Sequence, residues 1–174
     1  MSNHSVLAPE VEEVLRQAAR GRQRAEHLEP FLVGAREVLE AELGVAVERG
    51  PLRLEVGSHT TLDVTAIVGI TGQLTGVAIY GMTRQMALAV VGQLMGAPVD
   101  ALDDLALSGI GELGNVITGR AATLLAQHDV RADIAPPVLL VGAGTRVSTA
   151  GIQRLVVPLV TCLGTVEAQL AIKG

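Results

Sequence analysis

Almost all the hydrophobic residues of this chain are aliphatic. Hydrophobic residues make up 49% of the 174 residues, yet the chain has no Trp, one Phe (Phe31) and one Tyr (Tyr80). Its core must therefore be built from Val, Leu, Ile and Ala, which suits helices packed on a Val- and Ile-rich sheet. The length is enough for one domain with a sizeable core.

Charge and cysteine content argue against several classes of function. The formal net charge is −5, and the 13 Lys and Arg residues form no basic groove with interleaved aromatics, so nucleic-acid binding is not expected. The single Cys162 excludes an internal disulfide and a cysteine zinc cluster, and its apolar surroundings predict burial. The four histidines are dispersed, so we expect no metal site.

The start of the chain and its most apolar stretch both argue against export or membrane insertion. Residues 1–13 are polar and acidic, which is not the pattern of a signal peptide. Residues 74–99 are interrupted by Arg84, Gln85 and Pro98, so they do not form one continuous apolar helix. We therefore expect a cytoplasmic protein that does not contact a membrane.

Hydrophobic periodicity predicts the order helix, strands, helices, strands. Pro30 suits the first turn of the second helix, Thr83 can cap the third, and Asp103 and Asp104 suit the first turn of the fourth. This order predicts an α+β fold (an α/β two-layer arrangement), a sheet covered by helices, with a hint of two similar halves. Expected helices span residues 9–28, 29–43, 84–96 and 101–128; expected strands span 52–56, 63–71, 74–82, 134–141, 145–149, 155–162 and 166–172.

Residues 1–28 are interpreted as an N-terminal helical extension and residues 29–174 as the main domain. In the first predicted helix, acidic residues precede basic ones, which suits the helix dipole, whereas Gly21 weakens the helix. This segment is either a docking helix or a frayed one.

The long fourth helix has two contrasting faces when it is projected at about 100° per residue. Polar or small residues lie on one side, and apolar residues on the other are expected to pack on the sheet. Glu112 and Asn115 are three residues apart, so their side chains emerge as neighbours. The polar side holds Asp104, Ser108, Glu112, Asn115 and Gly119; the apolar side holds Ala106, Ile110, Leu113, Ile117 and Leu124.

Most polar helix faces are simply solvated, but the composition of this helix argues for a function. Asn is a poor helix former, and a glycine costs about 1 kcal/mol in a helix interior. The helix carries Asn115 together with four glycines, at positions 109, 111, 114 and 119. Such choices indicate selection for something other than helix stability. Gly119 lies one turn beyond Asn115 and would let another backbone come close.

The same helix contains a competing motif. Residues 109–114, GIGELG, match the glycine pattern of a dinucleotide-binding loop, and Asp129 follows twenty residues after Gly109. That loop needs a strand immediately before its first glycine, whereas residues 101–108 contain no β-branched residue. A dinucleotide enzyme is therefore the weaker hypothesis.

The polar face points to a known family. Ser108-x-x-x-Glu112-x-x-Asn115, followed by a proline some twenty residues on, resembles the signature of the CheC/CheX/FliY phosphatases of bacterial chemotaxis. The likeness covers roughly residues 29–174 and includes the strand pair at residues 67–76, IVGITGQLTG. It implies an antiparallel-rich sheet covered by two or three long helices, in pseudo-two-fold halves.

Two details bear on the branch of this family. Gly111-Glu112-x-x-Asn115-x-x-x-Gly119 is most similar to the CheX branch. CheC-type members carry the Glu/Asn pair in both halves, whereas here the second predicted helix has glutamates but no Asn, so one site is expected. One departure is that the prolines at positions 136 and 137 fall slightly earlier than the family's proline.

The resemblance implies a protein aspartyl-phosphate phosphatase that acts on a CheY-like receiver domain. Glu112 and Asn115 would be catalytic, with Asn115 holding the attacking water, and Ser108, Gly111 and Gly119 would contact the partner. No cofactor of its own is implied, because the receiver supplies Mg²⁺. The resemblance also implies a homodimer through edge strands, and residues 155–162 are apolar enough to need covering. The alternative is a non-catalytic module, like the flagellar switch proteins, that only binds receivers.

Overall fold

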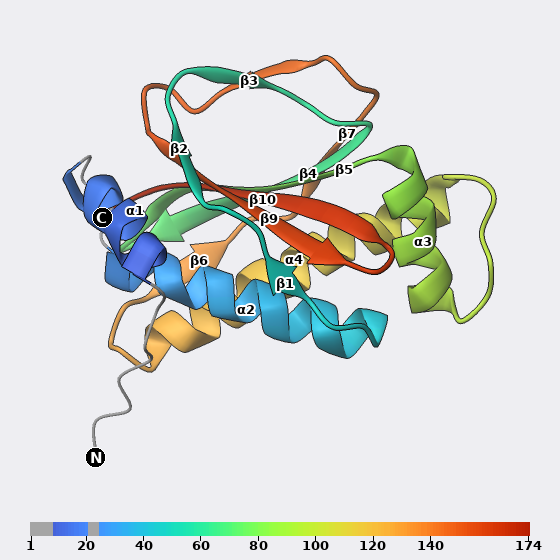
Figure 1. The fold of residues 1–174 in the computed structure, drawn as a ribbon, viewed down its shortest axis with the longest axis horizontal. Coiled ribbons are helices and arrows are strands. Elements are labelled where there is room, and N and C mark those ends of the chain that lie inside the picture. The colour runs from blue at the N-terminus through green and yellow to red at the C-terminus, as the bar shows by residue number, and fades with distance from the viewer. Residues whose placement is uncertain (1–8, 21–24) are drawn as a thin grey trace.

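The two long helices of this protein lie on one face of an antiparallel sheet, and an arch that contains the paired segments 58–60 and 146–148 crosses the other face (Figure 1). The computed structural model describes residues 9–20 and 25–174. Its helices are α1 (Pro9–Arg20), α2 (Ala25–Leu43), α3 (Arg84–Met95) and α4 (Asp104–Ala126). Its strands are β1 (Glu48–Arg49), β2 (Arg53–Glu55), β3 (Ser58–Thr60), β4 (Val64–Gly72), β5 (Thr75–Met82), β6 (Ala132–Ile134), β7 (Val138–Val141), β8 (Arg146–Ser148), β9 (Arg154–Thr161) and β10 (Gly164–Lys173).

The strand pairing reveals two similar halves. Each half is one long helix followed by five strands: α2 with β1–β5, and α4 with β6–β10. The main sheet has the order β1-β9-β10-β5-β4-β6, with β2 also on β9 and β7 also on β4. The first strands of each half thus pair with the hairpin of the other half, and β5 pairs with β10 at the centre. The predicted α+β fold with pseudo-two-fold halves is confirmed.

The boundaries of the first two helices differ from the sequence prediction in two places. The predicted helix 9–28 ends at Arg20 as α1, and residues 21–24 lie outside the described residues. The second helix begins at Ala25 rather than at residue 29, so Pro30 lies inside α2 instead of in its first turn. The reason is packing, because Leu28 and Phe31 are almost fully buried and hold the upstream turn against the core.

Helix capping explains the ends of the other two helices. Thr83 caps α3 as predicted by accepting a hydrogen bond from the Met86 amide, and Gly96 ends α3 at a φ of 67°. Asp103, predicted to lie in the first turn of α4, is instead its N-cap and accepts from the Ala106 amide at 2.8 Å. The helix therefore starts at Asp104.

The late strands also correct the prediction. Residues 134–141 do not form one strand, because Pro136 and Pro137 lack amide donors and separate β6 from β7. The strand over residues 155–162 is no open edge, since β9 lies between β10 and the short β1 and β2. Cys162, expected to be buried, is exposed in the β9–β10 turn.

A buried arginine connects the arch, which contains the paired strands β3 and β8, to the main sheet. The sequence analysis did not identify this arginine. Arg154 of β9 is 1% exposed. It donates to the Gln169 side chain at 2.9 Å, to the Gly57 carbonyl, and to Glu55 at 3.3 Å. His59 lies half-buried in β3, and burial lowers its pKa. The arch is thus a fixed part of the fold.

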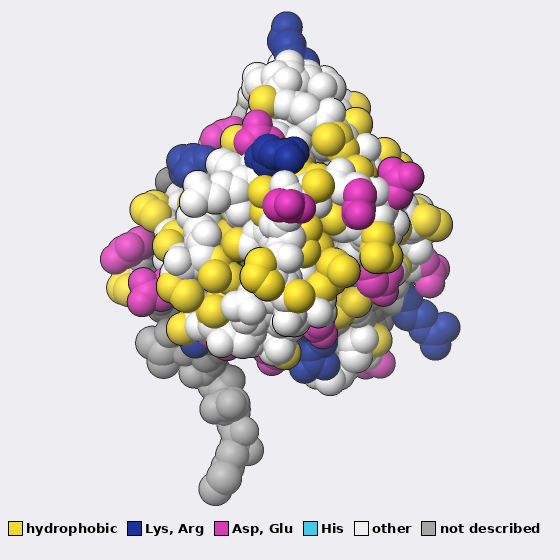
Figure 2. All heavy atoms as spheres, turned by 90° about the vertical axis from the view of Figure 1, so that its right-hand side faces the viewer, with side chains coloured by type: hydrophobic (Ala, Val, Ile, Leu, Met, Phe, Trp, Pro, Cys, Tyr) yellow, Lys and Arg dark blue, Asp and Glu magenta, His cyan; other side chains and the backbone are white. Residues whose placement is uncertain are grey.

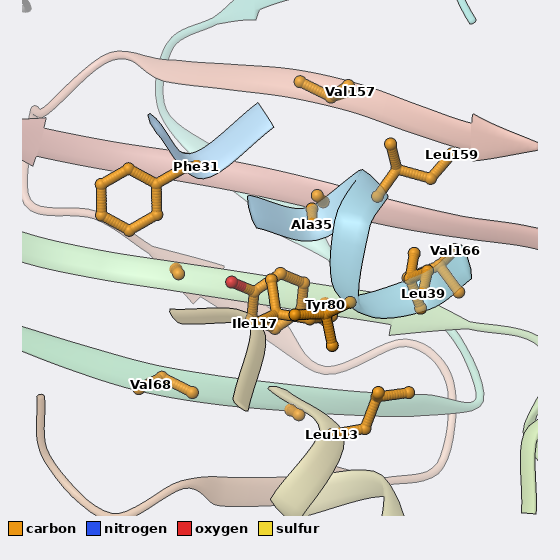
Figure 3. Close-up of a cluster of buried hydrophobic side chains, with 14 of the residues drawn as sticks. Phe31, Ala35, Leu39, Val68, Tyr80, Leu113, Ile117, Val157, Leu159 and Val166 are labelled. Carbon is orange, nitrogen blue, oxygen red and sulfur yellow. The ribbon is translucent and has the colours of Figure 1, made fainter. Parts of the chain in front are cut away.

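The core between sheet and helices fixes how α4 is rotated. Tyr80 of β5 and Ile117 of α4 both belong to the buried cluster between sheet and helices (Figure 3). The Tyr80 hydroxyl lies 2.9 Å from the Thr118 hydroxyl, which donates to the Gly114 carbonyl at 2.8 Å. A Cβ on Gly114 would lie 3.2 Å from the Tyr80 ring and 3.4 Å from the Ala66 Cβ. The missing side chain at Gly114 lets α4 lie close to the sheet.

Two glycines of α4 should therefore respond oppositely to alanine. A Cβ on Gly109 would meet only the Leu94 Cδ1, at 3.9 Å, so Gly109→Ala should stabilise the fold by up to about 1 kcal/mol through helix propensity. Gly114→Ala should be destabilising by about 1 kcal/mol, because an overpacking cost of about 2 kcal/mol exceeds the same gain, which leaves the two variants about 2 kcal/mol apart. Urea unfolding measures both free energies, and equal stabilities would contradict the packing role of Gly114.

Candidate functional site

The polar stripe of α4 faces away from the core. Ser108 and Glu112 are exposed, and Asn115 and Gly119 are half-buried. On the opposite side, Ala106, Ile110, Leu113 and Ile117 are buried as predicted, while Leu124 is only partly buried. The helix therefore presents Glu112 and Asn115 together on one outer face, one turn apart.

The side chains of Glu112 and Asn115 have no hydrogen-bond or ion-pair partner among residues 9–20 and 25–174. Neighbouring glutamates on α2 behave differently. Glu37 accepts from Arg120 of α4 at 2.7 Å, and Glu40 accepts from Arg36 at 3.1 Å. The side chains of Glu112 and Asn115 thus remain available to an external partner, whereas the carboxylates on α2 bind arginines within the molecule.

The glycines predicted to contact a partner have different surroundings. Gly111 is buried, and a Cβ there would lie 3.5 Å from Pro137 and 3.6 Å from Leu139. We therefore assign Gly111 to packing against the β6–β7 segment instead of to a partner surface. A Cβ on the half-buried Gly119 would lie 3.6 Å from the Ile134 Cδ1. The β6–β7 segment, which contains Ile134, therefore runs along one flank of α4 and borders the stripe.

The structure also tests the dinucleotide hypothesis. Residues 109–114, GIGELG, lie inside α4 and follow helical residues, not a strand. Their backbone amides are therefore committed to the helix and do not form a loop that could cradle a pyrophosphate. Asp129 lies beyond the end of α4 at a φ of 60°. The context that this motif requires is missing.

Neither a metal cluster nor a membrane span occurs in the described part of the chain. No group of three or more His, Cys, Asp or Glu residues there is arranged to hold a metal ion. None of the helices in those ranges combines the length and apolarity needed to cross a bilayer. On the stripe itself, Glu112 and Asp104 are the acidic side chains, eight residues apart.

A helix-covered antiparallel sheet of two similar halves is the fold of CheC-like superfamily proteins, as in a Shewanella structure that matches with 22% identity and a TM-score of 0.78 over 87% of this chain and 100% of that one. Residues 64–160 match the family described as chemotaxis phosphatase CheX. This chain belongs to the CheX family.

Individual relatives agree with this assignment. Over 119 residues the chain is 34% identical to the CheY-P phosphatase CheX of Thermotoga maritima, covering 67% of this chain and 76% of that protein. The CheX structure from Desulfovibrio desulfuricans matches with 26% identity and a TM-score of 0.75, over 83% of this chain and 97% of that one. A CheX–CheY–BeF₃–Mg²⁺ complex from Borrelia burgdorferi contains a chain that matches with 31% identity and a TM-score of 0.73, over 85% and 98%.

Because Asn115 has no partner within the described chain, its replacement should not weaken the fold. Asn115→Ala should raise the free energy of unfolding by about 0.5 kcal/mol, since Ala is the better helix former. Thr118→Ala, on the same helix, should cost about 1–3 kcal/mol because it leaves the buried Tyr80 hydroxyl without its partner. Chemical denaturation of both variants would show this contrast, and a destabilised Asn115→Ala would mean that Asn115 serves the fold.

Proposed function

We propose that this protein stimulates hydrolysis of the aspartyl phosphate on a CheY-like receiver domain. The observation that carries the proposal is the unpaired, outward-facing Glu112 and Asn115 on a rigid helix of a CheX-family chain. The Thermotoga relative is named a CheY-P phosphatase, and the Borrelia structure is a complex of CheX with CheY. Together these favour a receiver domain as the substrate.

Asn115 is the residue proposed to hold the attacking water. A carboxamide accepts a hydrogen bond from water and donates another at the same time, and it keeps the same charge at every pH. The held water attacks phosphorus in line, the bond from phosphorus to the aspartyl oxygen breaks, and inorganic phosphate and a free carboxylate result. Positioning of this kind supplies several kcal/mol, with about 7–11 kcal/mol as the upper range.

Glu112 is proposed to fix the register of docking. Its carboxylate is exposed and unpaired, so it is free to form an ion pair with a lysine at the receiver's active site. Ser108, one turn before Glu112 on the same stripe, is placed to hydrogen-bond Glu112 or the partner. Gly119 leaves room near Asn115 for the partner's backbone.

The metal of the reaction is assigned to the partner. The stripe has one carboxylate beside Asn115, and a Mg²⁺ site needs several oxygen ligands in octahedral geometry. The residues of α4 therefore do not fit a metal site of their own. Mg²⁺ bound by the receiver would stabilise charge on the phosphoryl group, while this chain contributes the water-holding amide and the docking carboxylate.

The alternative function is a binding module that recognises phosphorylated receivers without hydrolysing them. The retained Asn115 favours the enzyme, because a docking role alone gives no reason for an Asn in the middle of a helix. Phosphate release with the cognate receiver separates the two functions, since a pure binding module would protect or ignore the phosphoryl group.

Substitutions at the two central residues should have different effects. Asn115→Ala should reduce stimulated dephosphorylation by at least about a hundredfold while largely preserving receiver binding, because only the water loses its holder. Glu112→Ala should weaken binding and rate together. Phosphate release and receiver affinity are the measurements, with the exposed Glu42→Ala on α2 as the control. Full activity of Asn115→Ala would refute the assignment.

We further propose that the protein is a homodimer formed through the β7 edge. Among the described strands, β7 pairs only with β4, and Val138 and Val141 on it are 58% and 60% exposed. An open edge with exposed apolar side chains favours pairing with a second copy.

Light scattering coupled to size exclusion tests this oligomeric state. The wild-type chain should have twice the mass of one copy, and Val138→Lys should shift it to the monomer by placing a charge at the paired edge. Val56→Lys is the matched control, because Val56 is 72% exposed but precedes β3 in the arch. A wild-type monomer would exclude the dimer.

A further inference from the structure

The stripe around Glu112 is too small to hold a protein partner by itself. Ser108 to Asn115 spans about 10 Å along the helix axis. A stable protein interface buries about 800 Å² on each partner and obtains most of its affinity from a few well-packed, desolvated side chains. The docking surface must therefore extend along α4 beyond the polar residues.

Two exposed apolar side chains lie where this extension must run. Leu105 is 67% exposed and Val116 is 37% exposed. They lie seven residues before and four residues after Glu112, which places all three on one face of α4. At a rise of 1.5 Å per residue, Leu105 is about 10 Å and Val116 about 6 Å from Glu112 along the axis. Neither is needed for the core, because the other side of α4 is already buried.

The surroundings of Leu105 extend this apolar surface towards α3. A Cβ on Gly109 would lie 3.9 Å from Leu94, so the last turn of α3 adjoins this flank of α4. Met95, which ends α3, is 53% exposed. Figure 2, which views the side of the molecule where α3 lies, shows hydrophobic side chains spread between scattered acidic and basic ones.

The charges around Leu105 indicate the chemistry of the partner. Asp100, Asp103, Asp104 and Glu112 are exposed, and no Lys or Arg occurs between residues 100 and 119. This acidic border repels an acidic surface and favours a partner that is apolar with basic groups nearby. On the proposed function, such a partner also presents its phosphorylated aspartate to Asn115.

We propose that Leu105 and Val116 are the apolar anchors that seat the phosphorylated receiver domain on either side of Glu112. This inference rests on the proposed function, which supplies the occupant. The anchors contact the receiver beside its phosphorylation site and act on binding, whereas Asn115 acts on the chemical step. They therefore set the affinity for the receiver and not the rate of the chemical step.

The test measures receiver affinity and turnover separately. Leu105→Ala should raise the KM and the Kd for the phosphorylated receiver about tenfold, and Val116→Ala about threefold, with kcat unchanged. Val56→Ala is the matched control, since Val56 is 72% exposed and lies in the arch. Ala is a good helix former, so both helix variants should fold, and circular dichroism checks this.

Three outcomes separate this inference from the proposed function. If Leu105→Ala and Val116→Ala have the same KM and Kd as Val56→Ala, the proposed anchor role is contradicted, even if Asn115→Ala abolishes hydrolysis. Loss of the dimer in Leu105→Ala with an unchanged receiver Kd would also overturn them, because Leu105 would then contact a second copy. If the wild-type chain binds the receiver without hydrolysing it, the weakened Kd of Leu105→Ala still supports the anchors while the phosphatase proposal fails.

Discussion

The contact of Gly114 with Tyr80 is the constraint on which the rest of the site depends. Without a side chain at Gly114, α4 approaches the sheet closely enough for the Tyr80 hydroxyl to reach Thr118. Burial raises the pKa of the Tyr80 phenol, so this group stays protonated in the hydrogen bond. A helix that is held both by close packing at Gly114 and by the buried hydrogen bond between Tyr80 and Thr118 has little freedom to rotate. The direction in which Glu112 and Asn115 point follows from this link.

The two similar halves of the fold carry unequal surfaces. The carboxylates of α2 are used within the molecule: Glu37 pairs with Arg120, and Glu40 accepts from Arg36 and from the Val47 amide. The Arg36 side chain holds the pKa of Glu40 below its usual value. On α4 the corresponding kind of residue, Glu112, has no such partner among the described residues. The pseudo-symmetry of the backbone is thus broken by side-chain pairing, which leaves one candidate site.

The sequence predicted the long helices, the hairpin strands and the outward-facing stripe because these depend on local periodicity and capping. It did not predict the short β1 and β3 or the early start of α2, which depend on tertiary packing. Arg154 was missed for the same reason: its burial is compensated by Glu55, which lies 99 positions away in the chain. The break between β6 and β7 was also missed, although Pro136 and Pro137 mark it in the sequence itself. The burial of Gly111 was not predicted, because nothing in α4 alone shows that Pro137 lies against it.

The glycines of α4 therefore have two separate explanations, and only one concerns function. Gly114 is required by its close approach to Tyr80, so its cost to the helix is offset by packing, while Gly111 is buried beside Pro137 and Leu139 at distances that would also admit a Cβ. Asn115 has no comparable polar contact in the described chain, although it also lowers helix stability. A residue that costs stability and pairs with nothing within the described fold is best explained by something outside it. This contrast between Gly114 and Asn115 on one helix is the strongest structural argument that the stripe serves a partner.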